Sequence, residues 1–286
     1  MRTVKYVRLS VIRLYLLPCR MQTQPLISII TVCYNAADCI TETLQSACNQ
    51  SYPKIELIIV DGGSKDNTLE CLKPFADRIA TLISEKDDGI YDAMNKGVNR
   101  ANGEWIYFLN AGDRFYNNHV LENVFGAPIP PTCGLIYGKV QTINEPTGVN
   151  YTAGGPVSLH DFYSRYPINH QATFTRKLVF DSLGGYSTRY RLAADTEWFI
   201  RFFKQNTFTA QFTDSIISFY DIQGASYHKR MQGYREYLQF SSEYFPVGIT
   251  LKNYLLYPVL WTKVKLIRML TGTSLFAWYR KKKFAH

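Results

Sequence analysis

Short apolar runs alternate with segments of helical spacing through the first part of the chain. Four runs rich in β-branched or aromatic residues are typical of buried strands: 26–34, 55–60, 80–84 and 105–109. The segments between them place apolar residues three or four positions apart and are predicted helices: 35–49, 66–75 and 90–101. This alternation predicts an α/β fold with a mostly parallel central sheet, flanking helices and right-handed crossovers.

The second part of the chain has a less regular pattern. Residues 135–143 and 170–174 are predicted strands, and residues 176–183 are a predicted helix. A further helix is predicted to begin at Asp195, because an aromatic apolar stretch follows it. Asp195 either caps that helix or supplies a carboxylate that can act as a general base.

Polar side chains gather where the predicted strands end. These residues are Tyr34 and Asn35, Asp61, residues 85–88, Asn110 and Asp113. Because the carboxyl ends of parallel strands meet at one edge of a sheet, we expect one site there. The turn after the first strand has no glycine, so neither a GxGxxG fingerprint nor a GxxxxGK phosphate loop is present. This argues against a dinucleotide-binding or P-loop enzyme.

Residues 105–113 (WIYFLNAGD) have the clearest pattern of a strand followed by a ligand-binding turn. Five bulky residues are followed abruptly by small residues and the acid Asp113. A carboxylate at this position can hold a hard cation against a phosphate group. Asp113 can equally cap the next turn, as aspartate often does.

Five ordered motifs resemble glycosyltransferase family two, the inverting enzymes of the GT-A type. They are VCYN at 32–35, VDGGSKDNT at 60–68, SEKDDGIYDAMNKG at 84–97, GEWIYFLNAGD at 103–113 and LAADTEW at 192–198. The resemblance covers about residues 26–220, and within the family the sequence is similar to bacterial members that build capsule, O-antigen or exopolysaccharide repeat units. It implies a GT-A fold with a Rossmann-like sheet, a nucleotide-diphosphate sugar donor (a UDP-sugar above all), and single displacement at the anomeric carbon.

The resemblance also implies roles on the donor side. Tyr34 and Asn35 flank the base and ribose, and Asp61 hydrogen-bonds the uracil or ribose. Asp88 and Asn95 line the donor sugar and ribose. From the residues alone, Asp61 is equally a turn residue before two glycines, and Tyr34 equally a packing residue.

The resemblance also implies roles near the diphosphate and the acceptor. Asn110 belongs to the donor site, and Asp113 faces a divalent cation, Mg²⁺ or Mn²⁺, and the diphosphate. Asp195 is the catalytic base, which takes the proton of the acceptor hydroxyl. His170 and Gln171 contact the acceptor, although a histidine in this position is more often a hydrogen-bonded structural residue.

The chain departs from the commoner family pattern at two positions. Asp61-Gly62 stands where a pair of aspartates is usual, and residues 110–113 (NAGD) stand where DxD is usual. One carboxylate is then left for the cation. Mg²⁺ and Mn²⁺ accept water, amide oxygen and substrate phosphate as remaining ligands, so one acid suffices with weaker expected metal affinity.

Positive charge is concentrated at the two ends of the chain. The net charge is +9, yet residues 1–20 carry five basic side chains and no acid, and the residues after Glu243 carry eight and no acid. Removing these 13 charges leaves −4 for the residues between. This distribution argues against a nucleic-acid groove and favours an anionic membrane surface as partner. Six cysteines without CxxC spacing fit reduced thiols in a cytoplasmic protein.

The C-terminal part is predicted to lie on a membrane without crossing it. Its longest uncharged stretch, 253–262, is shorter than the roughly 20 residues that a spanning helix needs. An apolar stripe is predicted at Leu256, Leu260, Val264, Ile267 and Leu270. The predicted organisation is a basic extension (1–25), a nucleotide-sugar-binding half (26–115), an acceptor-binding half with the base (116–245) and a basic amphipathic tail (246–286).

Three functions are compatible with these observations. The first is an inverting glycosyltransferase, peripheral on the inner face of the cell membrane, that acts on a polyprenyl-linked or glycan acceptor. The second is a nucleotidyltransferase of similar fold, which attacks at phosphorus and needs no base at Asp195. The third is a non-catalytic relative that binds a sugar nucleotide or lipid with a degenerate metal motif.

Overall fold

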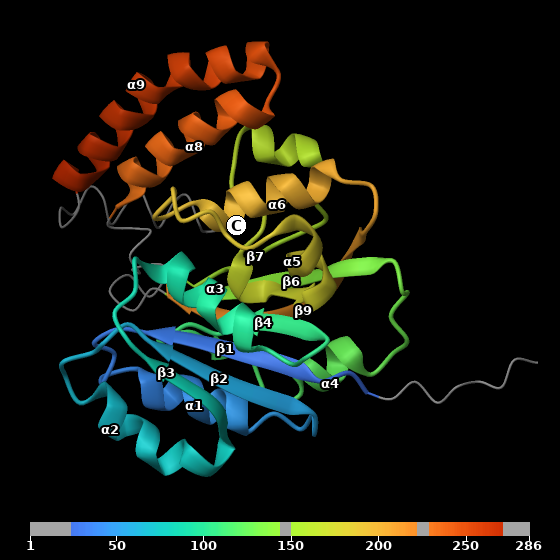
Figure 1. Cartoon of the computed structure of the whole chain (residues 1–286). Helices are drawn as coiled ribbons and strands as arrows, with labels where there is room; N and C mark the ends of the chain where they lie inside the picture. The colour runs from blue at the N-terminus through green and yellow to red at the C-terminus, as the bar shows by residue number, and fades with distance from the viewer. Residues whose placement is uncertain (1–23, 144–149, 222–228, 271–286) are drawn as a thin grey trace, which may run out of the picture.

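The computed structural model describes residues 24–143, 150–221 and 229–270 (Figure 1). Within these residues nine strands form one sheet in the order β3-β2-β1-β4-β8-β6-β9-β5, with β7 paired to β6. The strands are β1 (Ile27–Cys33), β2 (Ile55–Asp61), β3 (Ile79–Ser84), β4 (Trp105–Phe108), β5 (Arg114–Phe115), β6 (Cys133–Ile143), β7 (Thr152–Ala153), β8 (Thr173–Arg176) and β9 (Thr209–Asp221).

Helices cover both faces of this sheet. The α-helices are α1 (Ile40–Cys48), α2 (Thr68–Leu72), α3 (Ile90–Arg100), α4 (Val120–Phe125), α5 (Lys177–Leu183), α6 (Ala194–Lys204), α8 (Arg230–Tyr244) and α9 (Val247–Leu270). The 3₁₀ helices are η1 (Lys73–Arg78), η2 (Leu159–Tyr163) and η3 (His170–Ala172). Figure 1 shows α1 and α2 on one face, α3 on the other, and the α8–α9 pair stacked beyond α6.

The four strands expected in the first part of the chain are confirmed, and they are parallel. β1 pairs with β2 on one side and with β4 on the other, and β3 pairs with β2. The chain therefore moves outward from β1 to β3 and then returns to the opposite side of β1. Such a reversal of strand order is the switch point at which open α/β sheets bind ligands. The second half of the sheet is mixed, because β8 runs antiparallel to both β4 and β6.

The pleat of the central strands divides the core into two clusters, one on each face of the sheet. Ile30, Ile58 and Ile106 pack with apolar residues of α3, α5 and α6. Their neighbours Ile29 and Tyr107 point to the other face and pack with α1 and α4. Because successive strand residues point to opposite faces, a strand covered on both sides must be apolar throughout. This explains the continuous apolar runs in the sequence.

Two predicted helices have different boundaries in the structure. The helix expected at 35–49 begins at Ile40, because residues 35–39 form a loop. Asn35 has a φ of 47°, and the backbone N–H groups of Ala36 and Ala37 bond to side chains of the 66–68 loop. The helix expected at 66–75 is short: α2 ends at Leu72 and continues as η1, whose first turn contains Pro74.

The strand expected at 170–174 is also corrected. Residues His170–Ala172 form a 3₁₀ turn, closed by a 3.0 Å hydrogen bond from Ala172 N to Asn169 O, and β8 starts only at Thr173. The apolar alternation of this stretch does not distinguish a tight turn from a strand. The turn raises His170 above the sheet edge, where its ring faces α6.

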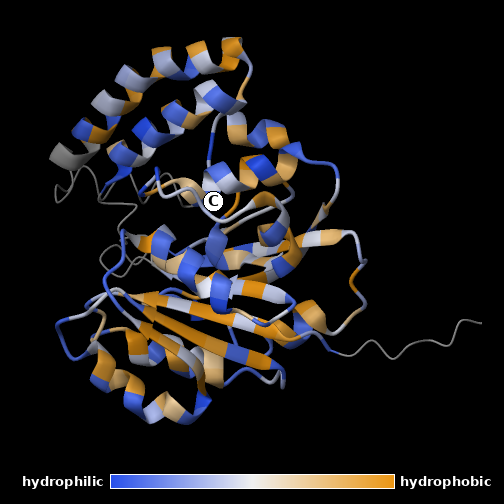
Figure 2. Cartoon of the chain, viewed as in Figure 1, coloured by the Kyte–Doolittle hydropathy of each residue, from blue (hydrophilic) through white to orange (hydrophobic). Residues whose placement is uncertain are grey.

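The helix α9 exposes the predicted stripe only in part. Leu256 is exposed as expected, but Leu260 is half-buried and Val264 is buried, because that side of the helix faces the protein. The exposed apolar side chains also include Val247, Leu251, Leu255 and Val259, spaced four residues apart. Hydrophobic and hydrophilic positions alternate along α9 (Figure 2). The side chains of Ile267 and Leu270 lie outside the described residues. None of the helices that the structure describes has the length and apolarity to cross a membrane.

One continuous sheet joins the two predicted halves, so the boundary near residue 115 stays a prediction. The basic extension falls almost entirely on residues 1–23, outside the described part of the chain. Among the residues that are described, five cysteines are free thiols: Cys33, Cys39, Cys48, Cys71 and Cys133.

Candidate active site

The candidate site lies at the switch point between β1 and β4. The two strands stay paired past their ends, because Leu109 N bonds to Ile30 O at 3.0 Å and Ala111 N to Val32 O at 3.1 Å. Tyr34 and Asn35 follow β1, whereas Asn110 and Asp113 follow β4. The fold therefore brings two of the predicted polar groups to the same edge.

Tyr34 and Asn35 border the first part of this edge. The Tyr34 side chain is 60% exposed, and its ring and the carboxylate of Asp87 both lie beside Gly62. A β-carbon at Gly62 would come within 2.4 Å of that carboxylate, so a larger residue there would displace the Asp87 side chain. The Asn35 amide accepts a hydrogen bond from Lys65 N at 2.9 Å, which ties the two loops together. A flat exposed ring between polar groups is suited to stacking with a nucleotide base.

Asp61 has no exposed surface. Its carboxylate accepts hydrogen bonds from the backbone N–H groups of Gly63 and Ser64 and from the hydroxyls of Ser64 and Ser84. These bonds determine the shape of the loop that follows β2. The donor contact expected of Asp61 stays a prediction, and the structure assigns it a loop-shaping role.

Asp88 lies just before α3, and Asn95 lies in the middle of this helix. Asp88 is exposed and precedes Gly89, which has a φ of +114°. The guanidinium of Arg191 lies close to Gly89. A small crevice is lined by Asp88, Asp92 and Arg191. The Asn95 amide, by contrast, bonds to both the N–H and the carbonyl of Tyr186, each at 2.8 Å. It therefore connects α3 to the loop after α5, and its predicted donor contact is untested.

Asn110 and Asp113 form the turn after β4. Asp113 N bonds to Asn110 O at 2.9 Å, and Gly112 adopts a φ of +97° between them. Asp113 is 8% exposed, and its negative charge acts on His170 nearby. The Asn110 Oδ1 atom is buried and has no hydrogen-bond partner.

This turn fits a divalent cation only in a restricted way. No group of three or more potential ligands from His, Cys, Asp and Glu occurs within the described ranges. Within the turn at residues 110–113, Asp113 contributes the single carboxylate and Asn110 an amide oxygen. A hard cation with so few protein ligands takes its remaining oxygens from water and substrate phosphates. The residues present therefore fit a cation that enters together with a diphosphate.

Asp195 lies in the first turn of α6, one residue inside the helix. The capping position is Ala193, and no side chain caps the helix there, so the alternative of Asp195 as a helix cap is wrong. Its Oδ1 atom accepts hydrogen bonds from the Tyr91 hydroxyl at 3.0 Å and from Thr196 N at 2.7 Å. Its Oδ2 atom lies 3.1 Å from Nδ1 of His170. The positive end of the helix dipole stabilises the carboxylate.

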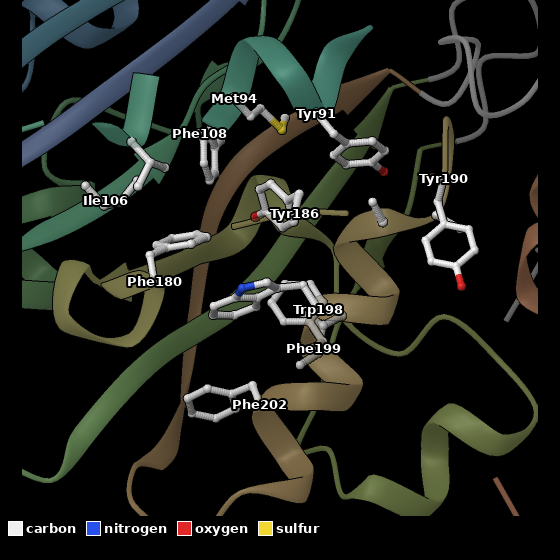
Figure 3. Close-up of a cluster of buried hydrophobic side chains, with 14 of the residues drawn as sticks. Tyr91, Met94, Ile106, Phe108, Phe180, Tyr186, Tyr190, Trp198, Phe199 and Phe202 are labelled. Carbon is white, nitrogen blue, oxygen red and sulfur yellow. The ribbon is translucent and has the colours of Figure 1, made fainter. Parts of the chain in front are cut away.

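A cluster of buried aromatic side chains holds α6 against α3 (Figure 3). Tyr186 lies between the Tyr91 ring of α3 and the Trp198 ring of α6, at centroid distances of 5.4 and 6.0 Å. Burial and the adjacent Asp195 charge raise the pKa of Tyr91 well above its ordinary value. Tyr91 therefore stays protonated and donates to Asp195.

Glu236 of α8 fixes the start of α6. It is 6% exposed, and its Oε2 atom accepts hydrogen bonds from Leu192 N at 2.8 Å and Ala193 N at 3.1 Å. These are backbone donors at a helix start that no local side chain satisfies. Sequence reasoning missed Tyr91, Arg191 and Glu236, because their partners lie far away along the chain.

His170 and Gln171 lie beside the base. Both ring nitrogens of His170 are engaged, Nδ1 with Asp195 and Nε2 with the Asn110 amide at 3.0 Å. Burial lowers the pKa of His170, but the hydrogen bond and charge of Asp195 outweigh it, so the pKa lies above its ordinary value. Gln171 is buried, and its carbonyl accepts a bond from the Tyr107 hydroxyl. The acceptor contacts expected of both residues stay predictions.

A parallel sheet with polar residues at its switch point and a carboxylate on the facing helix defines a glycosyltransferase of the GT-A type. The profile of the family described as glycosyl transferase family 2 matches residues 28–195, more than half of the chain. The chain belongs to this family. The resemblance expected from the five motifs is thereby confirmed.

Two curated relatives show where sequence similarity is strongest. The chain is 35% identical over 202 residues to the PGL/p-HBAD biosynthesis glycosyltransferase of Mycobacterium bovis, covering 69% of this chain and 77% of that protein. It is 39% identical over 95 residues to the putative teichuronic acid biosynthesis glycosyltransferase TuaG of Bacillus subtilis, covering 32% of this chain and 38% of that protein.

Solved structures confirm the GT-A fold. S. aureus TarS 1-349 in complex with UDP-GlcNAc matches 75% of this chain and 65% of its own, with a TM-score of 0.59 and 18% identity. The mannosyltransferase PcManGT from Pyrobaculum calidifontis, in complex with GDP-Man and Mn²⁺, matches 92% of this chain and 81% of its own, with a TM-score of 0.60 and 18% identity.

Proposed function

We propose that this protein is an inverting glycosyltransferase that moves a sugar from a nucleotide-diphosphate donor, a UDP-sugar above all, to a hydroxyl of a lipid-linked or glycan acceptor. The names of its relatives, which are biosynthetic glycosyltransferases, support a place in surface polysaccharide biosynthesis. The nucleotide-sugar complexes of TarS and PcManGT support the donor class. The observation that carries the proposal is the geometry of the Asp195 carboxylate.

An ionised carboxylate offers about four lone-pair positions. Three of those on Asp195 accept hydrogen bonds, two on Oδ1 and one on Oδ2. The remaining position on Oδ2 can take the proton of an acceptor hydroxyl. The hydroxyl oxygen then forms a bond to the anomeric carbon while the bond to the diphosphate breaks on the opposite face. General-base assistance of this kind contributes about 10²- to 10⁴-fold to the rate.

We further propose that Mg²⁺ or Mn²⁺ enters with the donor and that Asp113 is its protein ligand. When bound, such an ion offsets the negative charge of the leaving diphosphate. The chain's own residues then have three tasks. Tyr34 and Asn35 border the nucleotide, the turn at residues 110–113 faces the diphosphate, and Asp195 accepts the proton.

Replacing Asp195 by asparagine tests the proposed function. Asn keeps an oxygen for Tyr91 and Thr196, so the free energy of unfolding should change by only about 1 kcal/mol. Because an amide is no base, kcat for transfer should fall by about 10²-fold or more while donor affinity is kept. Asp181→Asn is the matched control, since that carboxylate is exposed and pairs only with Lys177.

The same assay separates the alternatives. The assay uses UDP-, GDP- and dTDP-sugars with Mn²⁺ or chelator, and the anomeric configuration of the product is determined by NMR. A fully active Asp195→Asn enzyme would exclude Asp195 as the base. Release of sugar 1-phosphate instead of nucleoside diphosphate would indicate attack at phosphorus by a nucleotidyltransferase, and donor binding without turnover would indicate a non-catalytic protein.

We also propose that α9 rests on the inner face of the cell membrane and brings the enzyme to its acceptor. The exposed stripe of Val247, Leu251, Leu255 and Val259 has no covering element among the described residues. The helix carries no acid, and its exposed lysines favour an anionic bilayer. Lys265 lies over the exposed Trp261 ring at 5.0 Å, a pairing suited to the headgroup region.

Vesicle flotation tests this placement. Leu255→Glu combined with Val259→Glu should remove binding to vesicles that contain phosphatidylglycerol, because two charges would enter the apolar face. Leu178→Glu is the matched control, since Leu178 is 57% exposed on α5. Binding of wild-type protein should weaken as salt screens the basic residues. Unchanged binding of the double variant would contradict the proposed face.

A further inference from the structure

Three polar side chains from separate elements form one hydrogen-bonded chain across the site. His170 of η3 stands in the middle, with Nδ1 3.1 Å from Oδ2 of Asp195 on α6 and Nε2 3.0 Å from Nδ2 of Asn110 after β4. The two ends are 85 residues apart in the sequence. The His170 and Asp195 side chains are each only 16% exposed.

The chemistry of the partners determines the proton positions in this chain. A carboxylate only accepts hydrogen bonds, so Nδ1 of His170 carries the proton that faces Asp195. In the neutral ring Nε2 is then the acceptor, and the Asn110 amide donates to it. Both ring nitrogens of His170 have a matching partner in this arrangement.

We propose that His170 is a positioning residue that connects the base to the turn facing the donor diphosphate. This role rests on the proposed function. It differs from the acceptor contact expected from the sequence, because neither ring nitrogen of His170 is left for an acceptor.

The consequence for the reaction is geometric. Displacement with inversion requires the base and the departing diphosphate to lie on opposite sides of the anomeric carbon. His170 links the two sides directly, since Asn110 belongs to the donor turn and Asp195 is the base. Tyr91 and Thr196 hold Oδ1, and His170 holds Oδ2 so that its remaining lone pair faces the site. A displacement of about 1 Å at such a position costs on the order of 10²-fold in rate.

Two amide substitutions separate the two contacts of the ring. In His170→Asn the side-chain amide takes the place of Nδ1 and can still donate to Asp195. In His170→Gln the longer side chain places its amide near Nε2 and loses the bond to Asp195. His160→Gln is the matched control, because His160 is exposed and contacts only the ring of Tyr163 among the described interactions.

The variants are compared by kcat, by the KM values of donor and acceptor, and by donor affinity from calorimetry. We expect His170→Gln to lower kcat by about 10- to 100-fold, with both KM values within about threefold of wild type. His170→Asn should keep kcat within about fivefold of wild type, because it restores the bond to the base. A merely structural histidine would show equal losses in both variants, and this result would overturn the proposal.

A rise in acceptor KM with unchanged kcat would also overturn it, because it would make His170 an acceptor contact. If His170→Gln does not fold, Asn110→Ala breaks the other end of the chain. The proposal then requires a lower kcat, and an unchanged kcat rejects it. Failure of the proposed function itself is distinguishable, since it would appear as an inactive wild-type enzyme or a fully active Asp195→Asn variant.

Discussion

The hydrogen bonds from the start of α6 to Glu236 make this buried acid the most informative site for a stability measurement. Its Oε2 atom accepts from two backbone N–H groups, those of Leu192 and Ala193, and its Oε1 atom accepts from the Gln232 amide at 3.1 Å. Ala193 is 1% exposed, so its N–H has no ready access to water. Removing Glu236 therefore leaves backbone donors of the base-bearing segment without partners.

The expected magnitude follows from these contacts. Each buried donor that loses its partner costs about 1–3 kcal/mol, so Glu236→Ala should lower the free energy of unfolding by about 3–5 kcal/mol. Glu236→Gln keeps the shape and an acceptor oxygen but loses the charge. Hydrogen bonds to charged groups are worth roughly 1 kcal/mol more than neutral ones, so this variant should lose about 1–2 kcal/mol.

Urea unfolding followed by tryptophan fluorescence measures both losses, since Trp198 of α6 is completely buried. Glu243→Ala is the matched control on the same helix, because Glu243 is exposed and its ion pair with Arg189 should contribute at most about 1 kcal/mol. Asp195 lies two residues after Ala193, whose N–H group bonds to Glu236. Glu236→Gln should therefore also lower kcat for transfer while donor affinity is unchanged. A Glu236→Ala protein within about 0.5 kcal/mol of wild type would refute the reasoning.

Two further predictions concern the cation and the response to acid. Asp113→Ala should abolish the difference in turnover between Mn²⁺ and chelator, and wild-type turnover of this variant in chelator would show that the reaction needs no metal. Burial raises the pKa of Glu56, but hydrogen bonds from Ser28, Asn102 and Gly103 outweigh it and hold that pKa below its ordinary value of 4.5. Because a lowered carboxyl pKa stabilises the fold above the unfolded pKa, this contribution should vanish as the pH falls below 4.5. Thermal unfolding should therefore depend less on pH in Glu56→Gln, and an identical pH profile would contradict this.

The sequence by itself determined most of the sheet and the location of the site. Continuous apolar runs predicted β1, β2 and β4 almost to the residue, because a strand covered on both faces has no polar side to obscure the pattern. Polar residues at the strand ends located the switch point, since all parallel strands end at one edge. The aromatic stretch after Asp195 predicted a helix that begins there, and α6 begins at Ala194.

Contacts between distant segments were decided only by the tertiary structure. Tyr91 meets Asp195 across 104 positions of the chain, and Glu236 reaches back 43 positions to Ala193. No local periodicity contains such pairs. The hydrogen bonds that the Asp61 carboxylate accepts could not be predicted either. An aspartate before two glycines is equally compatible with a ligand contact and with a turn.

In the C-terminal helix α9, too, the sequence determined some properties and the tertiary structure determined others. Its length and its lack of acid follow from the sequence, but α9 is apolar on more than one side. The choice of exposed face depended on which side packs against the rest of the protein, and Val264 turned inward while Leu255 and Val259 faced outward. Spacing along a chain defines the faces of a helix, whereas only its neighbours in space decide which of them is buried.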